Sequence, residues 1–206
     1  MTDLTASLAR LEEADAALQA AGPAPFPVPL GSHAPVVAGA LAALERGDWW
    51  APGLRERVGA VLRGAPVERL VDASAGARPY RVLPAGPSPA LRALEAVGLA
   101  AADTERCVLA HVGVGVLGEG RWHEALNLAG LLRPSVIFVL AEHPLGPDAP
   151  LSAQTAADPA ALAQAHGLGV HTANGSDAAA VRDAVAAARA AGGPHLVIAR
   201  LSPARA

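Results

Sequence analysis

The sequence predicts an α/β fold with a mainly parallel sheet that is covered by helices on both faces. From residue 107 onward, apolar runs typical of strands alternate with helical periodicity in the order β-α-β-α-β-α-β. Residues 135–140, SVIFVL, form a continuous apolar run, which indicates a strand buried on both faces. A glycine-rich turn joins the first strand of this series, residues 107–112, to a helix expected to begin near Arg121. Because such a turn gathers backbone N–H groups at the positive end of a helix dipole, it indicates a phosphate site.

The composition fits a domain of this class and excludes several kinds of partner. The chain has 206 residues, is 52% hydrophobic and carries a formal charge of −3, with no basic run. A sizeable core can therefore form, and neither nucleic acid nor an anionic membrane is an expected partner. No apolar run approaches the roughly 20 residues of a membrane span, and the N-terminus lacks a signal-peptide pattern, so we expect a cytoplasmic protein. The single cysteine, Cys107, is expected to be a buried, inert thiol.

The first half of the chain reads as helices joined by proline-rich and glycine-rich turns. We expect residues 1–30 to form an N-terminal helix and a proline-rich arm, and residues 31–206 to form a single domain. The helix over residues 2–20 has a narrow apolar seam, which suits packing either on its own domain or against another subunit. Trp49 and Trp50 are expected in a turn, as packing residues rather than a ligand platform. Further helical signal covers residues 34–44, 54–62, 67–71 and 89–101.

The second half carries clearer start and stop signals. Asp158 followed by Pro159 predicts the N-terminus of a helix that runs to about residue 167. Asp177 caps a long alanine-rich helix, which is expected to end at the glycine pair 192–193. The remaining strands are predicted at residues 168–171 and 196–201.

One interpretation of the glycine-rich turn is a dinucleotide site. Gly113, Gly115 and Gly118 satisfy the pattern G-x-G-x-x-G after a strand. Glu142 ends the next strand, where a dinucleotide-binding domain places a carboxylate for the ribose hydroxyls. On this interpretation the protein binds a nicotinamide or flavin nucleotide.

A longer match supports another interpretation. Residues 118–127, GEGRWHEALN, are followed by an apolar strand and then by Gln154-Thr155. This stretch resembles the alpha subunit of thiamine-diphosphate-dependent 2-oxo acid dehydrogenases, the decarboxylating first component of pyruvate and branched-chain complexes. There the region reads G-D-G, E-G-x-x-H-E-A-L-N, an apolar strand and N-N-G-Y. Residues 31–63 are similar to the family's G-Q-E-A helix, G-D-W turn and Y-R segment. The resemblance, which is poorest over residues 74–99, implies the thiamine-diphosphate-binding fold.

The resemblance also implies where the family's cofactor ligands fall. Val114 takes the place of the aspartate of G-D-G, a ligand of the magnesium ion that holds the diphosphate. Glu142 and His143 take the places of the two asparagines of N-N, of which the second is also a ligand. Leu54 replaces the tyrosine of Y-R, so that only Arg55 remains to reach a phosphate. The catalytic histidine loop that follows the last strand in the family is absent, so the chain is expected to be a truncated as well as a degenerate relative.

These replacements predict a cofactor site that no longer works. Mg²⁺ requires oxygen ligands, whereas Val114 offers none and the single imidazole of His143 makes no metal site. Glu142 would add negative charge beside a diphosphate. We therefore expect no bound thiamine diphosphate, no metal and no catalytic residue. The positions of the degenerate site are Arg55, Gly113, Val114, Gly115, Glu142 and His143.

The part of the match that is retained points to assembly. In the family the HEALN segment lies near subunit contacts, so His123, Glu124 and Asn127 are predicted interface residues. Our first hypothesis is a non-catalytic structural or regulatory subunit that forms a homo-oligomer or pairs with a beta-subunit-like chain. One alternative is a chain that still contributes to a thiamine-dependent 2-oxo acid dehydrogenase with such a partner, and the other is the dinucleotide-binding protein. The substrate, the partner's identity, the size of the oligomer and any new ligand of the loop 141–152 stay open.

Overall fold

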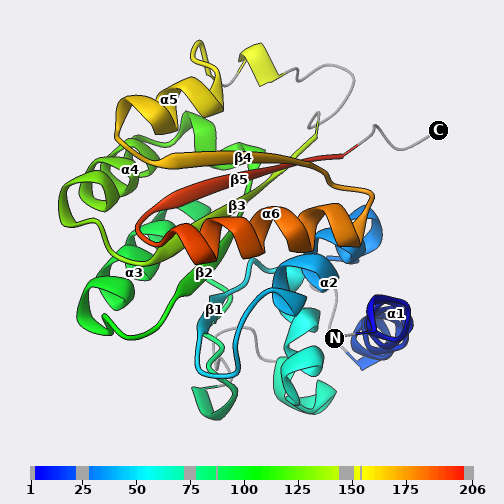
Figure 1. The fold of residues 1–206 in the computed structure, drawn as a ribbon. Coiled ribbons are helices and arrows are strands. Elements are labelled where there is room, and N and C mark those ends of the chain that lie inside the picture. The colour runs from blue at the N-terminus through cyan, green and yellow to red at the C-terminus, as the bar shows by residue number, and fades with distance from the viewer. Residues whose placement is uncertain are drawn as a thin grey trace.

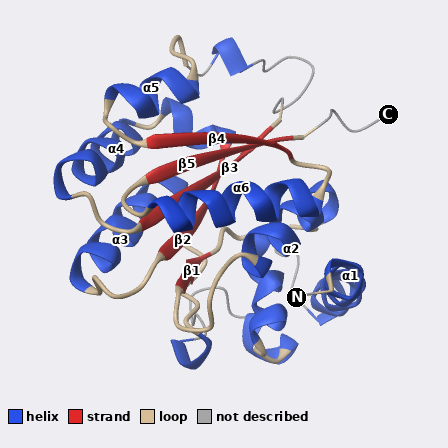
Figure 2. Ribbon diagram, in the orientation of Figure 1, coloured by secondary structure: helices blue, strands red, loops and turns tan. Residues whose placement is uncertain are grey.

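The fold is a five-stranded parallel sheet between two layers of helices (Figures 1 and 2). The computed structural model describes residues 3–21, 28–71, 78–86, 88–143, 151–153 and 155–201. The strands lie in the order β1-β2-β3-β5-β4, and every neighbouring pair is parallel. The predicted alternation of strands and helices after residue 107 is confirmed. The strands are β1 (Trp49–Ala51), β2 (Val108–Gly113), β3 (Val136–Glu142), β4 (Gly169–Asn174) and β5 (His195–Arg200).

Each face of the sheet has its own hydrophobic core. Alternate strand residues point to opposite faces, so Leu109 and Ile137 pack in one core while Val108 and Phe138 pack in the other. The first core is closed by α2 (Ala34–Ala42), α6 (Ala178–Ala191) and the 3₁₀ helix η2 (Glu56–Arg63), with α1 (Leu4–Ala21) packed on α2 and η2. The second is closed by α3 (Pro89–Ala102), η5 (Val114–Gly118), α4 (Gly120–Leu132) and α5 (Pro159–Ala165).

Several helix boundaries follow directly from side-chain caps. The Asp158 carboxylate accepts a hydrogen bond from the Ala161 backbone N–H at 2.9 Å, and Asp177 does the same for Ala179 at 2.8 Å. Both predicted N-caps are thus confirmed. The seam of α1 packs on the chain's own core, with Leu11 and Leu18 buried. Of the described helices, none is long and apolar enough to cross a membrane.

The main departure from prediction lies at the edge of the sheet. Trp49 and Trp50, expected in a turn, form β1 and pair with Val108 and Leu109 of β2. A strand of three residues is too short to show a period of two, which is why the sequence pattern hid it. Both indoles are packing residues as predicted, since Trp49 is 8% and Trp50 is 0% exposed.

Other corrections concern the type of helix that follows β1. The helices expected over residues 54–62 and 67–71 are instead 3₁₀ helices, η2 and η3 (Val67–Leu70). A further 3₁₀ turn, η4 (Arg78–Tyr80), precedes a bridge between Val82 and Trp50. Short 3₁₀ segments present nearly the same apolar spacing as an α-helix, so the sequence does not separate the two. These segments wrap the β1 edge of the sheet.

Candidate functional site

The predicted site residues follow the carboxyl ends of β1, β2 and β3, which lie side by side in the sheet (Figure 2). Gly113 at the end of β2 pairs with Ala141 of β3, so Val114 and Glu142 occupy corresponding positions just beyond the pair. His143 follows Glu142 directly, and Arg55 follows β1 by four residues. Ligand crevices of open parallel sheets form at this edge. The order of the strands therefore gathers these segments at one end of the fold.

The glycine-rich turn keeps an open backbone, but its central side chain lies in the core. A Cβ atom at Gly113 or Gly115 would meet nothing within 4 Å. Between them, the Val114 side chain is 1% exposed and packs in the core on the α3–α4 face of the sheet. The turn continues as η5 and leads into α4, which begins at Gly120. The shape of a phosphate cradle is thus present without a charged or oxygen-bearing side chain at position 114.

The charged residues of this edge have partners within the chain. Glu142 Oε2 lies 3.0 Å from Arg200 Nε, across the β3–β5 pair. Arg55 Nη1 donates a hydrogen bond to the Pro29 carbonyl at 2.6 Å. A ligand at this edge would therefore compete with existing contacts for both the carboxylate and the guanidinium.

A buried polar cluster, formed by His33, Glu56, His111 and Arg92, lies beside this edge and was missed by sequence reasoning. His33 Nδ1 contacts Glu56 Oε1 at 2.8 Å, and Arg92 Nε donates to the His111 carbonyl at 3.0 Å. All four residues are buried, and the ring of His143 stands edge-on to that of His33, with centroids 5.4 Å apart. The sequence offers one signal, since His111 interrupts the apolar run of β2. Most of the polar groups of the cluster are thus paired within the chain.

Burial and mutual interactions fix the protonation states of this cluster. Burial lowers the pKa of His111 to about 4, helped by the nearby charges of His33 and Arg92 and opposed by Glu56. Burial alone would raise the pKa of Glu56, but its hydrogen bond with His33 and the charges around it lower the value to about 2. Near neutral pH, Glu56 is therefore ionised and His111 is neutral. Because His111 Nδ1 accepts from Trp50 Nε1 at 2.8 Å, the neutral ring carries its proton on Nε2, which has no partner among the described atoms.

The residues at this edge do not fit a magnesium-bridged diphosphate. Mg²⁺ takes oxygen ligands in an octahedral array, whereas Val114 and His143, the two positions that the family resemblance assigns to metal ligands, carry an isopropyl group and an imidazole. Among the described residues, no group of three His, Cys, Asp or Glu side chains is placed to hold a metal ion. The assignment of Arg55, Gly113, Val114, Gly115, Glu142 and His143 to a degenerate site stays a prediction. So does the dinucleotide interpretation, in which Glu142 would have to leave Arg200.

The predicted interface residues lie on the outer surface of α4. His123, Glu124 and Asn127 are all exposed. Leu131, one turn beyond Asn127, is 71% exposed, and Leu132 is 57% exposed. Exposed leucines at the end of a helix that already presents His123 and Asn127 are compatible with a contact surface. The interface role stays a prediction.

Comparisons with known proteins agree with this fold. Transketolase from Leishmania mexicana superposes with a TM-score of 0.72 at 21% identity, covering 98% of this chain and 37% of that one. Transketolase from Campylobacter jejuni gives 0.70 at 21% identity, over 96% and 37%. At this identity the likeness concerns the fold alone, and it confirms the predicted thiamine-diphosphate-binding fold with its parallel sheet between helices.

Sequence comparisons identify the family. The 3-methyl-2-oxobutanoate dehydrogenase subunit alpha of two Mycobacterium tuberculosis strains is 33% identical over 190 residues, covering 80% of this chain and 50% of the relative. The chain thus spans about half the length of the curated relatives it matches. Residues 3–197 match the family described as "Dehydrogenase E1 component". The chain therefore belongs to the E1 dehydrogenase family, with an alpha subunit among its relatives, as the sequence motifs predicted.

Proposed function

We propose that this chain is a non-catalytic member of the E1 dehydrogenase family, acting as a structural or regulatory subunit. The observation that carries the proposal is Val114, which lies 1% exposed in the core at the position of the expected magnesium ligand. An aspartate there would have to leave the core to reach a metal, whereas valine gains from its burial. The open glycine turn around it remains, but the helix dipole contributes only about 1 kcal/mol toward an anion. That contribution is too small to replace a metal bridge.

The charge pattern at the crevice supports the same proposal. Glu142 stands beside the glycine turn and forms an ion pair with Arg200. Arg55 is held by the Pro29 carbonyl. The buried His33–Glu56 contact adds a second internally satisfied pair nearby. Each of these contacts stabilises the chain without a ligand, as expected where a fold outlasts its cofactor.

The expected partner is a second copy of the chain or a beta-subunit-like chain. The support is the exposed face of α4, which carries His123, Asn127 and the 71% exposed Leu131 at intervals of four residues. A surface leucine at the end of such a row would gain from burial in a contact. Charge reversal at Glu124 together with Leu131→Asp should lower the apparent mass in sedimentation velocity. The exposed pair Glu12→Lys and Leu91→Asp is a matched control, located on α1 and α3. Equal apparent masses for the wild type, the α4 variant and the control variant would show that the exposed face of α4 is not the subunit interface.

Calorimetric titration with thiamine diphosphate and Mg²⁺ tests the non-catalytic proposal. We expect no saturable, Mg²⁺-dependent binding heat at ligand concentrations up to about 1 mM. A site with a binding free energy of about −8 kcal/mol, which corresponds to a micromolar dissociation constant, would be saturated at that concentration. A micromolar dissociation constant that requires Mg²⁺ would overturn the proposal. Cooperative thermal unfolding of each preparation shows that the titrated protein is folded.

A catalytic role within a two-chain enzyme is the second candidate. It is favoured by the 33% identity to a 3-methyl-2-oxobutanoate dehydrogenase subunit alpha, although this chain covers 50% of that relative. Arg55 would then leave the Pro29 carbonyl and bind a phosphate, because guanidinium groups bind phosphate strongly. Decarboxylation of 2-oxo acids by the chain co-expressed with a beta-like partner, abolished by Arg55→Ala, would support it. Unchanged activity in that variant would exclude Arg55 from the site.

A further inference from the structure

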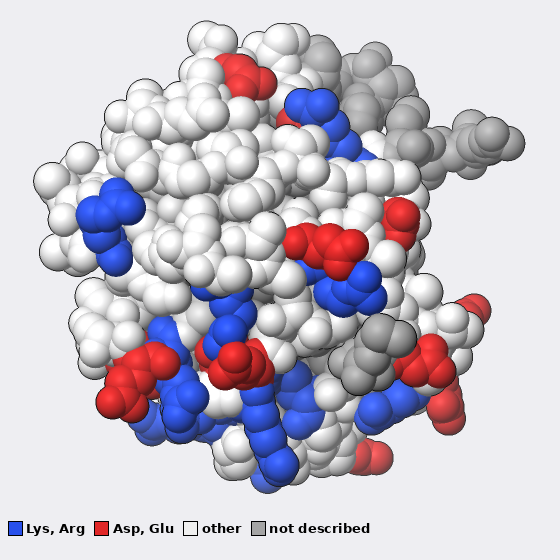
Figure 3. All heavy atoms as spheres, in the orientation of Figure 1, with Lys and Arg blue, Asp and Glu red and all other residues white. Residues whose placement is uncertain are grey.

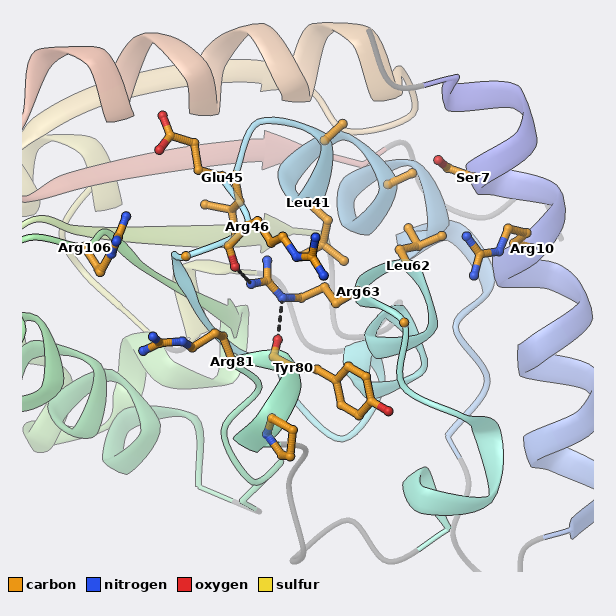
Figure 4. A pocket seen from close by; sticks show the side chains of 16 residues that line it. Ser7, Arg10, Leu41, Glu45, Arg46, Leu62, Arg63, Tyr80, Arg81 and Arg106 are labelled. Carbon is orange, nitrogen blue, oxygen red and sulfur yellow. Dashed lines mark hydrogen bonds between the residues drawn. The ribbon is translucent and has the colours of Figure 1, made fainter.

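A hollow lies near the amino ends of β1 and β2, whereas the candidate site lies at the carboxyl ends of the strands (Figure 4). Its volume is about 990 Å³, and its walls come from α1, the end of α2, the end of η2, η4 and the turns that precede β1 and β2. Five arginines from separate segments line it: Arg10, Arg46, Arg63, Arg81 and Arg106. We propose that this arginine pocket binds a small organic molecule that carries two or more phosphate charges.

The arginines of the pocket outnumber the carboxylates near them. Among the described lining residues the only carboxylate is that of Glu45, which already contacts Arg189 Nη1 at 2.7 Å, while Asp103, outside the lining, faces Arg81. The whole chain carries a formal charge of −3, so five guanidinium groups around one hollow are a local concentration of positive charge. Figure 3 shows basic groups on the lower part of the face in view, with acidic groups between them. Such a hollow attracts multiply charged anions.

Two of the five guanidinium groups are available to a ligand. Among the residues that the structure describes, the side chains of Arg46 and Arg106 form no hydrogen bond or ion pair. Arg106 is instead placed by Gly47, since a Cβ atom there would come within 2.8 Å of Arg106 Nη1. Arg10 uses one donor, from Nη2 to the Val61 carbonyl at 2.9 Å. Because a guanidinium has five N–H donors, most donors of these three side chains remain unused.

The other two arginines form the rigid part of the pocket. Arg63 donates to the backbone carbonyls of Tyr80 at 2.9 Å and of Asp48 at 2.7 Å. Arg81 stacks 4.7 Å from the centre of the Trp49 ring, and its Nη1 lies 3.8 Å from Asp103 Oδ2. Both side chains are fixed by the fold, so their charge is present before any ligand arrives. Pre-placed charge lowers the entropy cost of binding.

The shape and chemistry of the walls define the ligand class. Arginine forks form paired hydrogen bonds with phosphate oxygens, so a lining with several arginines suits a ligand that carries more than one phosphate charge. Leu41, Leu62 and Tyr80 supply apolar and aromatic surface between the charged groups, as Figure 4 shows. That surface suits an organic body such as a nucleoside. The expected ligand is therefore of the nucleoside-diphosphate type, bound without a metal.

The test compares two double variants with the same loss of charge. Arg46→Gln/Arg106→Gln removes the free pocket arginines, while Arg69→Gln/Arg121→Gln removes two exposed arginines that do not line the pocket. Inorganic pyrophosphate and adenosine diphosphate, both with a metal chelator, are titrated calorimetrically at low ionic strength. We expect binding below about 1 mM, weakened about tenfold or more in the pocket variant and within about twofold of wild type in the control. Adenosine diphosphate should bind more tightly than pyrophosphate if the apolar wall takes part.

A subtler variant probes the geometry alone. Gly47→Ala keeps every charge but displaces the end of the flexible Arg106 side chain, so it should weaken pyrophosphate binding without lowering the midpoint of thermal unfolding. Absence of binding for both probes at about 10 mM, or equal weakening in the pocket and control variants, would overturn the proposal. Binding only of a phosphorylated peptide or of nucleic acid would overturn it too.

Binding to the arginine pocket can be distinguished experimentally from binding to the cofactor site at the carboxyl edge of the sheet. Any binding of thiamine diphosphate that persists without Mg²⁺ and falls in Arg46→Gln/Arg106→Gln belongs to the arginine pocket. Binding that requires Mg²⁺ and is unchanged in that variant belongs to the carboxyl edge of the sheet. The two sites therefore succeed or fail independently.

Discussion

His111→Asn isolates the energetic role of the buried cluster. The ring is 1% exposed, and burial lowers its pKa from 6.5 to about 4. Between these values the unfolded chain binds a proton that the folded chain does not, so stability falls as the pH falls through the window. The difference of 2.5 pKa units corresponds to about 3 kcal/mol, fully present above pH 6.5 and lost by about pH 4. Glu56, with a pKa lowered from 4.5 to about 2, removes further stability only below pH 4.5.

Asparagine at position 111 keeps an oxygen acceptor for the Trp50 indole but does not titrate. The free energy of unfolding is measured by urea titration with tryptophan fluorescence. Between about pH 7 and pH 4 it should fall by about 3 kcal/mol more in the wild type than in His111→Asn. Equal pH slopes for wild type and His111→Asn would refute the assignment of the lowered pKa to His111.

Two further stability predictions test the packing at the ends of the sheet. Asp48→Ala should cost about 3 kcal/mol in urea unfolding, because the fully buried carboxylate accepts from Arg189 and from the backbone N–H groups of Cys107 and Glu45. Its loss leaves these N–H groups without their acceptor and leaves Arg189 with Glu45 as its remaining ion-pair partner. Asp183→Ala, whose side chain is 69% exposed, should cost less than about 1 kcal/mol, and equal costs would contradict the account. Gly130→Ala should cost about 1–3 kcal/mol, because its Cβ would overlap the His166 carbonyl, where α4 approaches the end of α5. Gly98→Ala, in open space on α3, should instead stabilise by up to about 1 kcal/mol, and a loss of stability there would show that the helix packing is misassigned.

The second half of the fold could be predicted because its signals are local. The apolar run of β3 and the caps at Asp158 and Asp177 each lie within a few residues of the element they define. β1 could not be predicted, because three residues at a sheet edge become a strand only through pairing with β2. The 3₁₀ form of η2 was also hidden, since its apolar spacing resembles that of an α-helix.

For the candidate site, the positions of the residues along the chain could be predicted, but their contact partners could not. Val114 and Glu142 lie where the motifs placed them, at the ends of neighbouring strands. The Glu142–Arg200 contact joins residues 58 apart, and the Trp50–His111 bond joins residues 61 apart. Contacts between residues so far apart in the sequence depend on the order of the strands in the sheet. The hydrophobic periodicity of helices and strands does not specify that order. The arginine pocket likewise appears only when α1, η2 and the two turns are brought together.

The most direct test of the central claim is a paired calorimetric titration with thiamine diphosphate and Mg²⁺. We expect no Mg²⁺-dependent binding to the wild-type chain and a measurable gain in Val114→Asp/His143→Asn, which places oxygen donors at the two positions that the family resemblance assigns to metal ligands. Circular dichroism must show that the double variant is folded, since position 114 is 1% exposed. Saturable, Mg²⁺-dependent binding to the wild type at micromolar concentration would contradict the claim that the fold has outlasted its cofactor.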